Sequence, residues 1–82
     1  MNHLDVENVK TLGGLKEEEI KALNRISQRN EILTRYGLAK LLKIDKKKAY
    51  RIVLKLMNFG YVKLAENKTI SITEIGKMFV LK

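Results

Sequence analysis

The chain has 82 residues, a formal net charge of +8, no cysteine and a single histidine, His3. This length suffices for one small domain with a modest core, and it leaves little room for a small-molecule ligand. The composition excludes disulfides, cysteine zinc sites and most metal or general-base constellations. We therefore expect no cofactor, no metal and no enzymatic activity.

No part of the sequence predicts a membrane segment. No apolar run approaches the roughly 18 residues that are needed to span a bilayer. The first residues also lack the basic-then-apolar order of a secretion signal. We expect a cytoplasmic protein without a membrane partner.

The positive charge is concentrated in residues 35–63. This segment contains nine basic side chains and one acid, Asp45, whereas the rest of the chain contains eight of each. Such a separation is typical of an electrostatic footprint on nucleic acid. The alternative is a lysine-rich surface that only keeps the protein soluble, but solubility does not require the charge to be segregated.

The first half of the chain predicts one helix after an unassigned segment. Residues 1–14 fit either a short helix or an arm that packs on the core, and residues 15–82 are expected to form the main domain. From Leu15 onward, apolar residues at helical spacing predict a helix over about 16–28. A turn follows, after which residues 32–33 could form a small strand.

Two more helices are expected in the basic segment. Thr34 is a suitable N-cap for a helix that ends near Leu42. A tight turn follows, and Asp45 is expected to cap a helix over about 46–58. The core stripe of that helix is predicted to be Ala49, Ile52, Val53 and Leu56. The opposite face is predicted to carry Lys47, Arg51, Leu54, Lys55 and Asn58, with Tyr50 at its edge.

After Gly60 the apolar pattern changes to strict alternation. This change predicts a β-hairpin over 61–73, with its turn at residues 66–68. The buried face of the hairpin is predicted to carry Val62, Leu64, Ile70 and Ile72. Thr73 can cap a last helical segment over 74–79. The expected fold class is α+β and mostly α, with three core helices, a two-stranded hairpin and a short C-terminal helix.

Lys46, Lys47 and Lys48 occupy the first turn of the predicted 46–58 helix. A lysine at this positive end of the helix macrodipole is unfavourable by roughly 0.3–1 kcal/mol. The helix that begins near residue 16 instead has the carboxylates of residues 17–19 in its first turn, so this composition can place charge favourably. We infer that the three lysines face a polyanion, for which the phosphates of DNA are the best candidate.

Residues 34–58 read as helix, short turn and helix, and the hairpin directly follows them. The runs 38–45, 49–56 and 58–62 resemble the winged helix-turn-helix regulators of bacteria and archaea. Residues 72–77 are similar to the segment that leaves the wing in the multiple-antibiotic-resistance-regulator-like branch. The resemblance covers about residues 15–79, and it implies a recognition helix in the DNA major groove with a hairpin wing beside it.

The resemblance also implies which residues contact DNA. The recognition positions early in the 46–58 helix are Lys46, Lys47, Tyr50 and Arg51. Among them, Arg51 can make a bidentate contact to guanine, and Tyr50 can meet a thymine methyl group or a phosphate. The expected phosphate contacts are Arg35, Lys48 and Lys55, with Asn67 and Lys68 at the wing tip. The wing tip lacks the arginine that larger wings of the family often carry.

Some of these residues have a simpler structural explanation. Tyr50 could pack on the preceding helix, and Arg51 could pair with an acid on the body of the domain. Tyr36 and Tyr61 are expected at the edge of the core rather than as stacking platforms for bases.

The resulting expectation is a sequence-specific double-stranded DNA-binding transcriptional regulator, acting as a repressor. A homodimer is expected because such regulators often bind two half-sites. The apolar run 78–81 or the segment 1–14 would form its interface, unless they fold back on the first helix. The alternative function is a winged-helix protein–protein interaction module of a transcription or replication complex.

Overall fold

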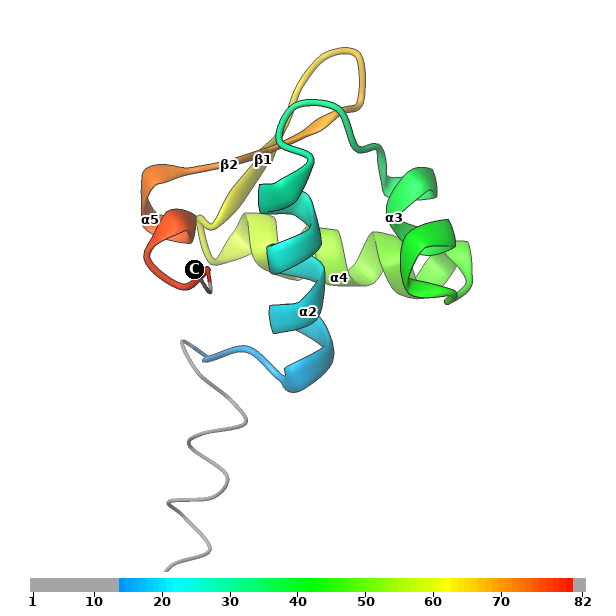
Figure 1. Ribbon diagram of the computed structural model, residues 1–82, viewed down its shortest axis with the longest axis horizontal. Helices are drawn as coiled ribbons and strands as arrows, with labels where there is room; N and C mark the ends of the chain where they lie inside the picture. Colours follow the sequence, from blue (N-terminus) through cyan, green and yellow to red (C-terminus); the bar gives the residue numbers. More distant parts are fainter. Residues whose placement is uncertain (1–13, 81–82) are drawn as a thin grey trace, which may run out of the picture.

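The computed structural model describes residues 14–80, which form a mostly helical α+β domain. Its elements, in the order of Figure 1, are α2 (Glu17–Gln28), α3 (Arg35–Leu42), α4 (Lys46–Asn58), β1 (Val62–Leu64), β2 (Ile70–Ile72) and α5 (Glu74–Lys77). α3 lies at the N-terminal end of α4, and the hairpin follows its C-terminal end (Figure 1). The predicted arm at 1–14 lies, apart from Gly14, outside the described residues, as does Leu81 of the apolar run 78–81.

The first helix, α2, begins as predicted. The backbone N–H of Lys16 donates to Glu19 Oε1 at 2.7 Å, which is one half of a capping box. Glu17, Glu18 and Glu19 place three carboxylates in the first turn, at the positive end of the helix dipole. These carboxylates therefore stabilise α2 through its dipole and make its N-terminal end strongly acidic.

Side-chain caps define the unit formed by α3 and α4. Thr34 Oγ1 accepts from the N–H of Gly37 at 3.0 Å, and Asp45 Oδ1 accepts from the N–H of Lys48 at 2.8 Å. Between the helices, Lys43 has left-handed backbone angles (φ 59°), and the N–H of Ile44 donates to the carbonyl of Ala39 at 3.0 Å. The predicted caps, the tight turn and both helix boundaries are thus confirmed.

The predicted hairpin is present, although its buried face is wider than alternation predicts. β1 and β2 pair antiparallel with Val62 opposite Ile72 and Leu64 opposite Ile70. All three residues of β2 are buried, including Ser71, because the chain before α3 covers the other edge of β2. There, the N–H of Ile70 donates to the carbonyl of Leu33 at 2.8 Å.

The small strand expected at residues 32–33 does not form. The backbone before α3 bonds to Ile70 of β2 through Glu31 and Leu33 and forms an isolated bridge between Thr34 and Thr69, but these contacts do not make a strand. Ile32 lies in a turn and is 75% exposed. The side chain of Asn30 accepts from the N–H of Ile72 at 2.9 Å and so occupies the position that a longer strand would use.

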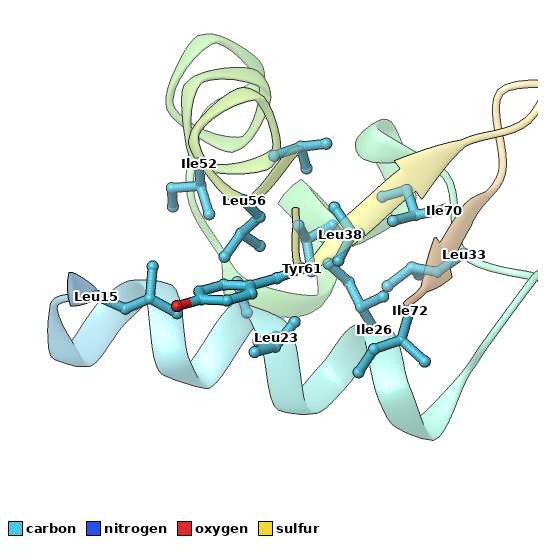
Figure 2. Close-up of a cluster of buried hydrophobic side chains, with 13 residues drawn as sticks. Leu15, Leu23, Ile26, Leu33, Leu38, Ile52, Leu56, Tyr61, Ile70 and Ile72 are labelled. Atoms are coloured by element: carbon cyan, nitrogen blue, oxygen red, sulfur yellow. The ribbon is translucent and has the colours of Figure 1, made fainter. Parts of the chain in front are cut away.

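The core lies between α2, α4 and the hairpin (Figure 2). The four core positions predicted for α4 are all buried. Of the helix α3 side chains, Leu38 and Ala39 are buried, while Leu41 and Leu42 are only partly buried. The largest fully buried side chains are Leu15, Leu23, Ile26, Leu38, Leu56, Ile70 and Val53.

The C-terminal segment folds back onto this core. α5 ends at Lys77, two residues before the predicted end, and Phe79 and Val80 pack against the core. The ring of Tyr61 lies 4.8 Å from that of Phe79, measured between centroids. Phe79 and Val80 therefore fold back onto the domain, which was the alternative to a dimer interface, whereas Met78 is exposed. None of the helices within residues 14–80 has the length and apolar character to cross a bilayer.

Candidate nucleic-acid interface

The unit formed by α3 and α4 carries a basic and aromatic surface, which we call the α3–α4 surface. It consists of Arg35, Tyr36, Lys40, Lys43, Lys46, Lys47 and Tyr50, all of which are exposed or half-buried. The acid within this stretch is Asp45, whose Oδ1 is engaged in capping α4. Within residues 14–80, the five cations of this surface take part in no ion pair.

Two tyrosine rings, those of Tyr50 and Tyr36, contact cations of the α3–α4 surface and thereby link α3 to α4. The guanidinium carbon of Arg35 lies 4.2 Å from the ring centroid of Tyr50, which joins the start of α3 to α4. The ammonium groups of Lys40 and Lys46 lie 5.0 and 5.7 Å from the ring centroid of Tyr36. Cation–π contacts of this kind hold the charged groups close together without neutralising them.

The tyrosines do not all lie where the sequence predicts. Tyr61 is buried in the core, but Tyr36 is 51% exposed, so the expectation that it lies at the core edge was wrong for this residue. Tyr50 contacts α3 through Arg35, as the packing alternative requires, yet its side chain keeps substantial exposure. Its ring is therefore positioned by α3 and accessible at the same time.

The opposite flank of α4 faces the acidic first turn of α2 and is chemically different. Lys48 Nζ lies 3.0 Å from Glu18 Oε2, and Lys55 Nζ lies 3.0 Å from Glu19 Oε1. Between the helices is a shallow depression of about 310 Å³. Its lining consists of Lys16, Glu18, Glu19, Lys48, Arg51, Ile52 and Lys55. Two of the expected phosphate contacts, Lys48 and Lys55, are thus held by carboxylates.

Arg51 lies on this same flank and is exposed. It lines the depression next to both glutamates but forms no ion pair within the part of the chain that the structure describes. Within residues 14–80, the structure therefore does not contain the ion pair between Arg51 and an acid of the body that the alternative predicted. Leu54 lies exposed further along α4, at 55%.

The expected contact residues fall into three groups. Arg35, Lys46, Lys47 and Tyr50 come together on the α3–α4 surface. Arg51, Lys48 and Lys55 lie on the α2 flank of α4. Asn67 and Lys68 belong to the exposed hairpin turn.

At the hairpin turn, the side chain of Asn67 has an internal role. Its Oδ1 accepts from the backbone N–H and the hydroxyl of Thr69, at 3.2 and 2.7 Å. This oxygen therefore helps to close the turn, and the amide nitrogen is the group left for an external contact.

Three residues of the α3–α4 surface were not predicted as contacts. They are Tyr36, Lys40 and Lys43, which belong to α3 and its C-cap, whereas the contacts predicted from the sequence lie mainly in α4. The signal was the spacing of Tyr36 and Lys40, which are four apart and so share one face of α3. In the structure, Tyr36 and Lys40 form a single cluster with Lys46.

Comparison of the chain with family models, curated proteins and solved structures gave no match. The geometry of the α3–α4 surface and its neighbours is therefore the basis for assigning a function. Among the described residues, no three acidic or imidazole side chains are grouped in a way that could hold a metal ion.

Proposed function

We propose that this protein is a winged helix-turn-helix transcriptional regulator that binds double-stranded DNA through the α3–α4 surface. The observation that supports this most is the unpaired charge of that surface. Five cations and two partly exposed tyrosines share it, while the α2 carboxylates that pair with α4 lysines lie on the other flank of α4 and Asp45 is engaged in capping. Unneutralised cations on one face are what binding to a phosphate backbone requires.

The dimensions of α4 fit this role. With 13 residues, α4 is about 20 Å long at 1.5 Å per residue. The major groove of B-DNA is about 12 Å wide and admits one α-helix. In the proposed complex, Lys46, Lys47 and Tyr50 approach the groove, and Arg35 contacts a phosphate from the start of α3. Arg51 approaches from the other flank and reads guanine.

The proposal extends to a homodimeric repressor that occupies two half-sites about one helical turn apart. Two apolar side chains of the C-terminal region, Ile75 and Met78, are exposed and available for a contact between copies. Sedimentation at micromolar concentration tests this part separately. A species of 9.5 kDa in the absence of DNA, together with a complex of one copy per duplex in its presence, would remove the dimer and leave DNA binding intact.

The experiment that tests DNA binding is a mobility-shift assay on random duplex DNA, followed by selection of the bound sequences. We expect a shift at moderate salt and enrichment of a common motif. The control is Lys21→Ala, which removes an exposed lysine from α2 and should leave binding unchanged. Retention on heparin without any duplex shift would contradict the proposal and favour the winged-helix protein-interaction module, whose partner would be acidic.

A further inference from the structure

The cations of α4 are divided by the position of α2. Lys48 and Lys55 are seven residues apart, so they lie on the same face of α4, two turns from each other. Each one meets a different carboxylate from the first turn of α2, at 3.0 Å in both pairs. Lys46 and Lys47 lie in the same first turn as Lys48, yet neither reaches a carboxylate within residues 14–80.

The two carboxylates are held to different degrees. Glu19 Oε1 also accepts from the N–H of Lys16, and the Glu19 side chain is only 12% exposed. It therefore has a structural role in beginning α2. Glu18 is 44% exposed and contacts Lys48, which is 45% exposed. An ion pair with this exposure is weak and exchanges readily with other charged partners.

We propose that Glu18 and Glu19 compete with DNA phosphates for Lys48 and Lys55, and that they thereby limit the affinity of the protein for DNA and the extent of its contact. The inference rests on the proposed DNA binding. A phosphate that approaches the α2 flank must displace a carboxylate already in place, whereas one that approaches the α3–α4 surface displaces none. The glutamates also repel phosphate from the depression that Arg51 lines.

Removal of the Glu18 charge should therefore allow Lys48 to contact one more DNA phosphate. In Glu18→Gln, Lys48 keeps its position on α4 but loses its carboxylate partner. One additional neutralised phosphate steepens the plot of log Kobs against log salt by about 0.9. The same relation makes the additional loss of affinity between 50 and 200 mM salt about 3.5-fold for this variant. At low salt the variant should bind more tightly than the wild type.

The matched control is Glu17→Gln. Glu17 lies in the same first turn and carries the same charge, but it is exposed and forms no ion pair with α4 within the described residues. This variant therefore reports the general effect of one fewer negative charge. We expect Glu18→Gln to exceed Glu17→Gln in both low-salt affinity and slope. Adding Lys48→Ala to Glu18→Gln should abolish the difference.

The measurement is fluorescence anisotropy of a labelled duplex across a salt series, with circular dichroism to confirm that each variant is folded. Equal slopes and affinities for Glu18→Gln and Glu17→Gln would overturn this inference while leaving DNA binding in place. A gain in Glu18→Gln that survives Lys48→Ala would also overturn it, because the gain would not pass through Lys48. Absence of duplex binding by the wild type would instead overturn the proposed function, and this inference with it.

Discussion

Lys47→Ala should make the protein more stable and at the same time a weaker DNA binder. Lys47 is the second residue of α4, and the three lysines of that turn have different surroundings. Lys46 lies near the ring of Tyr36, and Lys48 pairs with Glu18. Lys47 is exposed and has neither kind of partner among residues 14–80. Its unfavourable interaction with the helix dipole is therefore the least compensated of the three.

The expected magnitudes follow from this position. Removal of a cation from the first turn should raise the free energy of unfolding by about 0.3–1 kcal/mol. Alanine also has the highest intrinsic helix propensity, which adds in the same direction. For binding, we expect Lys47, although it lies at the groove, to act chiefly by neutralising one phosphate, so its loss should reduce the salt slope by about 0.9. Because a phosphate contact carries no sequence information, the affinity for all duplexes should fall about equally.

Lys40→Ala is the matched comparison. Lys40 belongs to the same surface but lies in the last turn of α3, where a cation interacts favourably with the dipole. In Lys40→Ala, the slope of log Kobs against log salt should fall by a similar amount. The free energy of unfolding, however, should fall rather than rise. Urea unfolding and anisotropy salt titrations measure the two quantities. The reasoning is refuted if Lys47→Ala destabilises the protein as Lys40→Ala does, or if its salt slope equals that of the wild type.

Four other variants test other parts of the molecule. Arg51→Ala should reduce discrimination between selected and random duplexes, and unchanged specific and non-specific binding would show that α4 is not the reader. Leu56→Ala empties a fully buried position and should lower the free energy of unfolding by about 2–5 kcal/mol. Leu54→Ala, at an exposed position of the same helix, should change the free energy of unfolding by less than about 0.5 kcal/mol. Gly76→Ala would place a Cβ atom 2.1 Å from the carbonyl oxygen of Tyr61, so α5 must shift. We expect a lower melting temperature for this variant with unchanged DNA affinity, and an unchanged melting temperature would contradict the close approach.

The sequence predicted the helices and the hairpin well because local signals determine them. Thr34 and Asp45 are N-caps whose side chains bond to their own helices, so no tertiary information was needed to find them. The short strand at residues 32–33 was a different case. Whether that backbone pairs along β2 depends on Asn30, which reaches across to Ile72 in the folded domain. A contact between residues 42 apart leaves no trace in local periodicity.

The candidate site was predictable in composition but not in arrangement. The charge excess of residues 35–63 was visible in the sequence, and its basic members lie on α3, on α4 or in the turn between them, except Lys63, which lies in β1. The sequence did not reveal that α2 brings its carboxylates to Lys48 and Lys55, because that depends on how two helices pack. For the same reason Tyr36 was assigned to the core edge, although the structure places it between the cations of Lys40 and Lys46.

The placement of acids explains why the α3–α4 surface keeps its charge. An acid in the first turn of α4 would stabilise that helix through its dipole, as the three glutamates do in α2. The first turn of α4 has no acid of its own; Asp45, at the cap, bonds through Oδ1 to the N–H of Lys48, and Glu18 of α2 reaches the Lys48 side chain. A carboxylate in the first turn of α4 itself would lie beside Lys47 and Tyr50 and would repel DNA phosphates. The N-terminal ends of α3 and α4, where DNA is proposed to bind, therefore lack this stabilisation, whereas the N-terminal end of α2 has it, and there Glu18 and Glu19 restrain Lys48 and Lys55.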